Sequence, residues 1–176
     1  PGAALTVFFT ADHHFGQGAA RGLFKRPFTD TAQMDAAMIE RWNATVGAAD
    51  TVWHLGDLAI RFERPAVEAL LARLHGTKHL VAGNNDPAAT RAATGWASVG
   101  DFAEIDVDGT AVVLCHYALR VWNGQGKAAW NLHGHSHGRL QPLPRQADVG
   151  VAAWDFRPVT LAEIKAARRR RGRGRR

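Results

Sequence analysis

Short apolar runs alternate with amphipathic stretches along the first half of the chain. The segments 5–10, 50–55 and 78–82 are brief β-rich runs, typical of strands in the interior of a sheet. Between the first two runs, Met34, Met38 and Trp42 recur every four residues. The preceding residues 29–31 are candidates for the N-cap of a helix. A second periodic stretch begins at Arg64-Pro65 and stops at Gly76. These patterns predict strands that alternate with amphipathic helices.

The second half of the chain changes to an antiparallel pattern. Segments 102–107 and 110–116 are strand-like and are joined by Asp108-Gly109, a strong hairpin signal. A last strand is expected at 147–151, and the sequence 160–163 resembles a capping box that starts a C-terminal helix. A short helix is also expected from Pro87, whereas the glycine-rich stretch up to Pro27 and the stretch after Tyr117 are too irregular to assign. The predicted strands and helices of both halves together favour one domain of layered sheets with helices outside.

A run rich in histidine, 130–138, stands out among these elements. His133, His135 and His137 alternate, which places them on one side if the backbone is extended, while the glycines allow a bend onto different targets. Neutral imidazoles are common ligands of transition metals, so the run indicates metal binding. The alternative is a surface loop that binds nothing.

Further residues of ligand type follow the predicted strands. The set comprises Asp12, His14, Asp57, Asn84 and His116, to which the histidine run adds His135 and His137. Sites in α/β sheets gather beyond the carboxyl ends of strands, although an aspartate there can also be a turn former or a helix cap. Two carboxylates, one amide oxygen and four imidazoles could hold two metal ions if one carboxylate bridges them. Donors without cysteine fit Mn, Fe, Zn, Co or Ni, and two such ions would clamp a phosphoryl group.

The motifs that contain these residues resemble those of the calcineurin-like metallophosphoesterases. They are Asp12-x-His14, Gly56-Asp57, Gly83-Asn84-x-Asp86, His116 and Gly134-His135-Ser136-His137. A small bacterial and phage subgroup is resembled more closely, through Arg26-Pro27-Phe28, Arg41-Trp42-Asn43, Trp53-His54-Leu55-Gly56-Asp57, Leu132-His133-Gly134-His135 and Phe156-Arg157-Pro158-Val159.

The resemblance covers about residues 5–165 and implies a four-layer α/β/β/α sandwich of two mixed sheets. It also implies two divalent ions, with Mn favoured, and a metal-bridging hydroxide that attacks phosphorus. Carried over by position, one ion would be bound by Asp12, His14 and His137, and the other by Asn84, His116 and His135. Asp57 would bridge the two.

Two positions depart from the family pattern. Asn85 stands where the family has a histidine that contacts phosphate and can protonate the leaving group, and Gln17 stands where the subgroup commonly has histidine. An amide donates a hydrogen bond but delivers no proton, and the loss of a general acid costs about 10²–10⁴-fold. With Asn85 and Asp57 as the catalytic candidates, we therefore expect a phosphodiesterase that acts on a small phosphoester, such as one derived from a nucleotide.

Several alternatives remain open at this point. His13, His54 or His133 could supply the proton, although each is closer to a structural histidine in character. The chain could instead be a phosphomonoesterase or nucleotide phosphatase of the same fold. It could also be a metal-binding scaffold with weak catalysis that works through partners or nucleic acid.

Composition changes the picture mainly at the C-terminus. The net charge is +6, but seven of the 22 basic residues lie within 168–176, which leaves 15 basic residues against 16 acidic ones. The sequence thus predicts a domain over 1–166 and a disordered, arginine-rich tail over 167–176 that could contact nucleic acid without sequence specificity. Cys115 is the only cysteine, so no disulfide can form within the chain. With no membrane-spanning run or signal peptide in view, we expect a cytoplasmic protein without a membrane partner, and the oligomeric state is left open.

Overall fold

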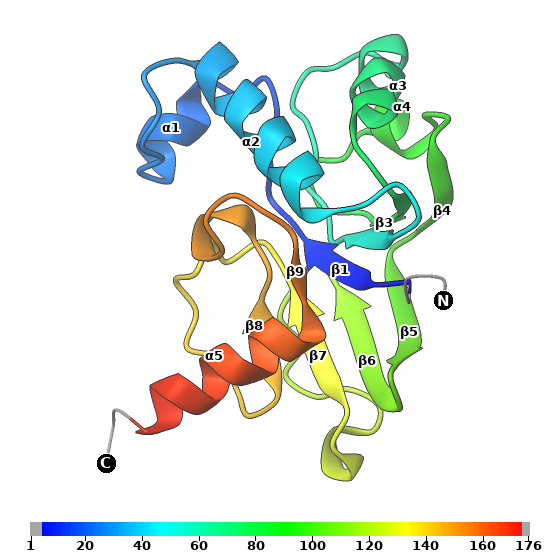
Figure 1. Ribbon diagram of the computed structural model, residues 1–176, viewed down its shortest axis with the longest axis vertical. Coiled ribbons are helices and arrows are strands. Elements are labelled where there is room, and N and C mark those ends of the chain that lie inside the picture. The colour runs from blue at the N-terminus through cyan, green and yellow to red at the C-terminus, as the bar shows by residue number, and fades with distance from the viewer. Residues whose placement is uncertain (1–4, 174–176) are drawn as a thin grey trace.

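The strands of the protein form two sheets (Figure 1). The computed structural model describes residues 5–173, with side chains through Arg170. The first sheet has the order β4-β3-β2-β1-β9, in which β1 to β4 are parallel and β9 is antiparallel to β1. Its strands are β1 (Val7–Thr10), β2 (Thr51–His54), β3 (Thr77–Val81), β4 (Trp96–Gly100) and β9 (Val159–Thr160).

The second sheet has the order β5-β6-β7-β8. The β5–β6 pair is antiparallel, whereas β6–β7 and β7–β8 are parallel, so this sheet is mixed like the first. Its strands are β5 (Phe102–Val107), β6 (Thr110–Cys115), β7 (Trp130–His133) and β8 (Gln146–Asp148). Two mixed sheets with helices around them confirm the predicted fold class.

Five α-helices and two short 3₁₀ helices connect and cover the sheets in the described part of the chain. They are α1 (Ala19–Leu23), α2 (Thr31–Thr45), α3 (Arg64–Arg73), α4 (Ala88–Arg91), α5 (Leu161–Arg173), η1 (Gln125–Lys127) and η2 (Val151–Ala153). None of the helices described reaches the length and apolar character that crossing a bilayer requires.

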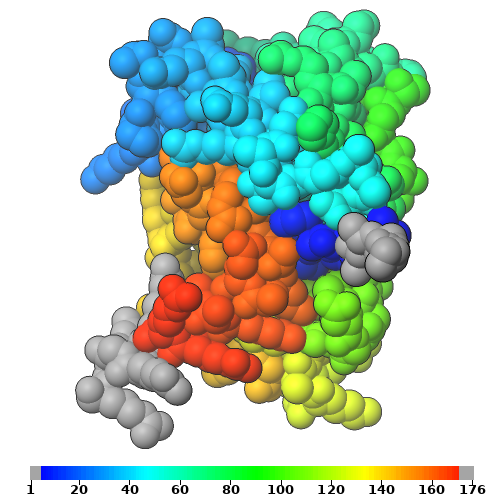
Figure 2. All heavy atoms as spheres, viewed as in Figure 1, coloured from blue at the N-terminus to red at the C-terminus, as the bar shows by residue number. Residues whose placement is uncertain are grey.

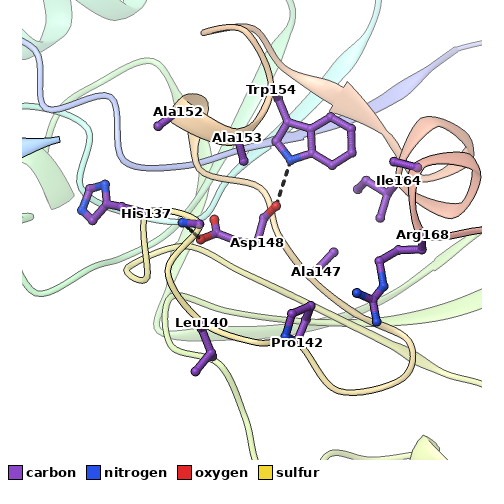
Figure 3. Close-up of a pocket in the computed structure, with 12 residues that line it drawn as sticks. His137, Leu140, Pro142, Ala147, Asp148, Ala152, Ala153, Trp154, Ile164 and Arg168 are labelled. Atoms are coloured by element: carbon purple, nitrogen blue, oxygen red, sulfur yellow. Dashed lines mark hydrogen bonds between the residues drawn. The ribbon is translucent and has the colours of Figure 1, made fainter. Parts of the chain in front are cut away.

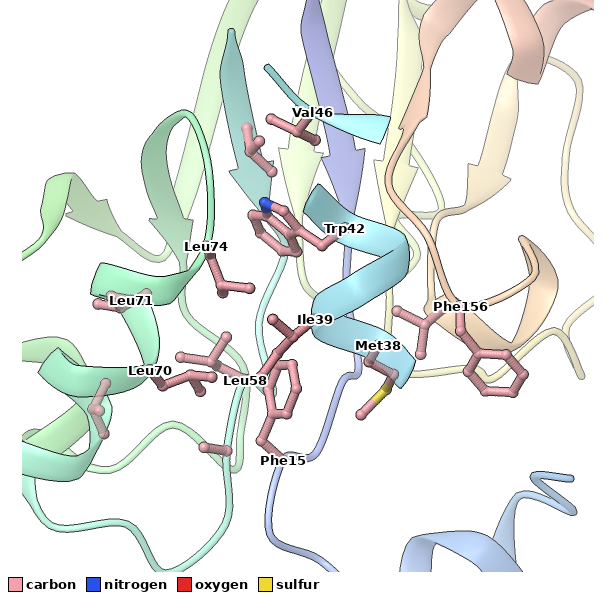
Figure 4. Close-up of a cluster of buried hydrophobic side chains, with 14 of the residues drawn as sticks. Phe15, Met38, Ile39, Trp42, Val46, Leu58, Leu70, Leu71, Leu74 and Phe156 are labelled. Carbon is pink, nitrogen blue, oxygen red and sulfur yellow. The ribbon is translucent and has the colours of Figure 1, made fainter. Parts of the chain in front are cut away.

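The apolar face of α2 packs on the first sheet beside α3 (Figure 4). Met38 and Trp42 are fully buried there, and the indole nitrogen of Trp42 donates a hydrogen bond to the carbonyl oxygen of His75 at 3.0 Å. The helix begins where the sequence indicated, because the carboxylate of Asp30 accepts a hydrogen bond from the backbone N–H of Gln33. The methionine and tryptophan stripe is therefore core.

A second core fills the space between the sheets. Phe9 of β1 and Leu55, which directly follows β2, meet Leu114 and Leu132 from the second sheet, and Ile164 of α5 joins them. Helix α5 lies at the side of the sandwich, against β9 and β1. The outer face of the second sheet is covered by the connection before β7, through a small cluster of Val113, Trp122 and Ala129. The fourth layer is therefore thin at this point.

Local signals placed most elements within a few residues of the observed bounds. The hairpin at 108–109 has φ of 51° and 74°, as a type I′ turn requires, and the capping box is reciprocal between Thr160 and Glu163. The sequence missed α1, β4 and β9, and the last predicted strand is shorter, ending at Asp148. These pieces are brief and depend on neighbours distant in the sequence.

The arginine-rich segment differs from its prediction over part of its length. Helix α5 runs through Arg173, so residues 167–173 are helical rather than disordered, and 174–176 lie outside the described residues. Arginine is a good helix former, and the capping box provides the helix start. A hydrogen bond from Arg168 to the carbonyl oxygen of Leu143 ties this part of the helix to the body.

Candidate metal centre

Seven side chains meet where five strands end. Two groups of three could each hold a metal ion, and within each group the ligand atoms lie within 4.8 Å of one another: Asp12, His14 and His137 in the first, and Asp57, His116 and His135 in the second. The amide oxygen of Asn84 joins the second group, 3.1 Å from Nε2 of His116. The structure thus brings together every residue that the sequence predicted as a ligand.

The carboxylate of Asp57 lies between the two groups. Its Oδ2 is 3.6 Å from Nε2 of His14, and its Oδ1 is 3.6 Å from Nε2 of His116. Each oxygen therefore faces a histidine of a different group. This is the arrangement that a carboxylate shared by two cations requires.

The hydrogen bonds of His116 fix which of its nitrogens is free. Nδ1 lies 2.7 Å from the carbonyl oxygen of Leu55, which only accepts, so Nδ1 carries the proton. In the neutral ring Nε2 then offers a lone pair, yet it faces the oxygens of Asn84 and Asp57. Lone pairs that converge in this way repel one another unless a cation lies among them, so the donor set fits a metal ion.

The first group has the same character. Nδ1 and Nε2 of His14 and Nδ1 of His137 are buried without a hydrogen-bond partner among the described residues. Burial lowers the pKa of both imidazoles to about 4, so both are neutral at pH 7. Buried polar atoms normally have partners, and neutral imidazole is the form that binds metals.

Left-handed backbone is concentrated at this site. Five of the seven predicted ligands have positive φ: Asp12 (58°), His14 (52°), Asp57 (59°), His135 (62°) and His137 (47°). Residues other than glycine adopt such φ at a cost, which the surrounding structure must offset, and such positions cluster at functional sites.

The histidine run bends instead of continuing β7. The strand ends at His133, whose Nδ1 donates to the carbonyl oxygen of Gly134 at 2.8 Å in the interior. The positive φ of His135 and His137 turns their rings to different groups. Of the two arrangements that the sequence allowed, the bend is therefore the one observed, and it supplies a ligand to each group.

Two buried or half-buried carboxylates hold the loops in place, and the sequence assigned neither a role. Asp86 accepts three backbone N–H bonds, from Asp57, Leu58 and Gly83, at 2.7–2.9 Å. Asp148 accepts from the hydroxyl of Ser136 and from the backbone N–H groups of Gly138 and Gly150. Asp86 therefore links the turns after β2 and β3, and Asp148 fixes the loop that carries His135 and His137. The only sequence signal was the position of Asp86 inside a motif.

Arg26 supports the first turn from behind. Its guanidinium is buried and donates to the carbonyl oxygens of Asp12 and His13, both at 2.6 Å. Burial lowers its pKa to about 10, so it stays charged near neutral pH. The sequence identified Arg26 only as part of a subgroup motif.

Replacing Arg26 by lysine is expected to weaken this support. A single ammonium cannot reproduce two donors held in a fork, so the free energy of unfolding should fall by about 2 kcal/mol and metal affinity by about 10–100-fold. Urea denaturation and metal titration measure these effects. Arg41→Lys, which changes a partly exposed arginine paired with the exposed Asp155, is the control and should change stability by less than about 0.5 kcal/mol. Equal effects of the two variants would contradict the role.

Asn85 contacts Asp57 directly. Its backbone N–H donates to Oδ1 of Asp57 at 2.9 Å, and its side-chain amide donates to Oδ2 at 2.8 Å. The residue at the general-acid position of the family pattern is therefore engaged with the central carboxylate. An amide in this place can orient Asp57, but it supplies no proton.

The remaining histidines near the motifs are interior residues. His13, His54 and His133 have no exposed surface. The N–H of Gly56 donates to Nδ1 of His54, so Nε2 of His54 carries the proton and donates to Nδ1 of His13 at 2.9 Å. None of the three is presented to a substrate, which leaves the proposal that one of them is the acid without support from the geometry.

His54 is expected to stay neutral in acid. Burial lowers its pKa from 6.5 to about 3, so between these values the unfolded chain binds the proton and the folded chain does not. The free energy of unfolding is therefore not reduced by His54 above about pH 6.5. Below that pH it falls by about 1.4 kcal/mol per pH unit, because only the unfolded chain binds the proton. Histidine side-chain NMR at pH 5 should show a neutral Nε2–H tautomer. A ring that protonates near pH 6 would contradict the assignment.

A cavity of about 420 Å³ lies next to the site. Of the predicted ligands only His137 lines it, and Figure 3 shows its imidazole directed away from the other lining side chains. Trp154 forms one wall and donates its indole N–H to the carbonyl oxygen of Asp148 at 2.8 Å. The cavity therefore adjoins the metal centre without containing it.

Comparison with known proteins agrees with this geometry. The model of the calcineurin-like phosphoesterase superfamily domain matches residues 6–148. An uncharacterised protein of Methanocaldococcus jannaschii is 26% identical over 168 residues, covering 88% of this chain and 86% of that protein. The gene 66 protein of Mycobacterium phage D29 is 30% identical over 179 residues, covering 84% and 88%. A solved protein of unknown function from Aquifex aeolicus shares the fold, with a TM-score of 0.73, 19% identity and coverage of 93% of this chain and 100% of that one.

Proposed function

This chain belongs to the calcineurin-like phosphoesterase superfamily, and from that premise we propose that it is a phosphodiesterase that works with two divalent metal ions. Membership supports metal-dependent hydrolysis of phosphoesters in general. The observation that carries the two-ion proposal is the position of Asp57, whose two oxygens each lie 3.6 Å from a histidine of a different group.

The proposed ligands follow the two groups. Asp12, His14 and His137 would hold one ion, and Asn84, His116 and His135 would hold the other, with Asp57 shared between them. The ions, with Mn favoured and Fe, Zn, Ni or Co also suited to oxygen and nitrogen donors, would lower the pKa of a bound water and neutralise charge on phosphoryl oxygens.

The protein contributes orientation around this centre. Asn85 holds both oxygens of Asp57 and so fixes the plane of the shared carboxylate. The backbone N–H of His135 donates to both oxygens of Asp12, at 3.1 and 3.0 Å, and fixes the first carboxylate in the same way. Such hydrogen bonds to metal-binding side chains restrict their rotation and strengthen binding.

The preference for diesters comes from the missing proton donor. Asn85 cannot protonate a leaving group, and His13, His54 and His133 are buried away from solvent. A substrate whose leaving group departs without protonation is the one that such a centre can use. Aryl diesters, anhydrides and strained cyclic nucleotides are of this kind, whereas alkyl monoesters depend most on an acid.

A matched pair of substrates tests the proposal. With added Mn²⁺, we expect an aryl phosphodiester to be hydrolysed faster than the monoester of the same aryl alcohol. Both release the same leaving group, so a difference in rate reports the preference for a diester or a monoester at phosphorus. Repeating the assay with Zn²⁺, Fe²⁺, Co²⁺ and Ni²⁺ identifies the ion that supports turnover. Equal or faster hydrolysis of the monoester would reverse the preference, and no hydrolysis with any ion would favour a metal-binding scaffold.

A further inference from the structure

A hollow of about 520 Å³ lies far from the metal centre and is lined by cationic side chains. Its size is that of an ordinary ligand site. The cations come from the connection before β7, the segment before β8, and α5: Lys127, Arg145, Lys165, Arg168 and Arg169. No acidic residue is among the lining residues that the structure describes.

Lys165 and Arg145 are oriented in this hollow by uncharged acceptors, without an ion pair among the described residues. Lys165 donates to the hydroxyl of Thr110 at 2.8 Å, and Arg145 donates to the carbonyl oxygen of Gln125 at 2.7 Å, both uncharged acceptors. Nε of Arg145 is buried without a hydrogen-bond partner within the described chain. The ion pairs found among the described residues include none with Lys127, Arg145, Lys165 or Arg169. Uncompensated cations around a concavity raise the local concentration of anions.

The hollow and the metal centre lie at opposite ends of the second sheet. Strands β6 and β7 begin beside the hollow, at Thr110 and Trp130, and end next to His116 and His133 (Figure 1). The space-filling view shows α5 (red) on the surface, away from α1 and α2 (blue to cyan) (Figure 2). An anion bound in the hollow would therefore not occupy the metal centre.

We propose that this hollow binds the phosphate backbone of single-stranded nucleic acid. The cations of the hollow reach α5 at Arg168 and Arg169, and Arg170 follows on the same helix. A ligand with many phosphates uses both the hollow and the helix, whereas one phosphate group uses only part of them. Trp130 borders the hollow but is a buried core residue, so contacts to phosphate rather than base stacking carry the site. This inference does not depend on the proposed catalytic function.

Other polyanions fit the same surface less well. The large exposed apolar side chains of the described residues, such as Val121 and Leu140, are not among those that line the hollow, and a membrane site would combine cations with such groups. A duplex is stiff and cannot follow a concave surface and then a helix. A flexible strand can place successive phosphates on both.

Fluorescence polarisation with a labelled oligothymidylate tests the site. Chelator is added so that the strand is not hydrolysed, and binding is measured at about 50 and 200 mM salt. The test variant carries Lys127→Gln, Lys165→Gln and Arg169→Gln. The control variant carries Arg64→Gln, Arg73→Gln and Arg91→Gln on α3 and α4, which removes the same charge elsewhere. Thermal unfolding verifies that both variants fold.

The test variant should bind at least about 10-fold more weakly than the wild type at low salt, with a salt slope smaller by about 2, since each lost contact to a single strand removes about 0.7. The control should stay within about threefold of the wild type. Equal weakening in both variants would overturn the site in favour of a net-charge effect. Absence of binding by the wild type would overturn it as well, as would tighter binding to a matched duplex or to anionic vesicles.

Discussion

Replacing Asp57 by asparagine is expected to lower phosphodiester hydrolysis by about a thousandfold or more. The two carboxylate oxygens face different histidines, and an amide offers only one oxygen, without charge, to two cations. Stabilisation of charge by metal ions contributes several kcal/mol to the transition state, and each 1.36 kcal/mol is tenfold in rate. The variant should also bind fewer than two ions per chain, as measured by elemental analysis after gel filtration.

The fold of the Asp57→Asn variant should remain intact. The new amide still accepts one of the two hydrogen bonds that Asn85 donates to Asp57, and loss of the charge relieves repulsion with the buried Asp12. Unfolding of the variant in chelator should occur within about 1 kcal/mol of the wild type. The matched control is Asp155→Asn, which changes an exposed carboxylate and should retain wild-type activity. Full activity in Asp57→Asn would remove the shared carboxylate from the mechanism.

Replacing Asn85 by histidine is expected to raise hydrolysis of an alkyl monoester by about a hundredfold, with a smaller effect on the aryl diester. The change places a transferable proton beside the centre, and general acid catalysis contributes about 10²–10⁴-fold where the leaving group is poor. The two specificity constants should be measured across pH. A new basic limb in the monoester profile near the histidine pKa would identify the imidazolium as the donor.

A second substitution separates the two roles of Asn85. Asn85→Ala removes the side-chain hydrogen bond to Oδ2 of Asp57 without adding an acid, so it should weaken hydrolysis of both substrates by a similar factor. If Asn85→His and Asn85→Ala behave alike toward the monoester, proton delivery at this position does not explain the predicted diester preference.

The sequence predicted the elements whose signals are local. The four-residue spacing of Met34, Met38 and Trp42 reports a helix face directly, and Asp108-Gly109 reports a hairpin, because both depend on neighbours in the chain. Strands β4 and β9 were not predicted, because a short edge strand forms only through its pairing with a neighbouring strand. Strand β9 is two residues long and exists through its pairing with Phe8 and Phe9.

The ligands could be predicted from the sequence because residues of ligand type recur at strand ends. The residues that hold these ligands in place could not be predicted. Arg26 acts through the backbone oxygens of Asp12 and His13, and Asp86 acts through three backbone N–H groups, contacts that carry no signature in side-chain type. The cationic hollow was not predicted for a related reason. The acidic residues that balance the charge of the body lie elsewhere, so composition could not show that Lys127, Arg145 and Lys165 meet.

The pairing of the first strand with the last has a consequence for how the protein is made. Strand β1 pairs with β9, and Asp12 depends on the backbone of His135, a partner 123 residues away in the chain. A polypeptide that emerges from the ribosome therefore exposes its first ligands long before their neighbours exist. Contacts of such long range slow folding and leave nascent intermediates open to aggregation. This site is completed only after His137 has been synthesised, and fragments that end before it would lack the site.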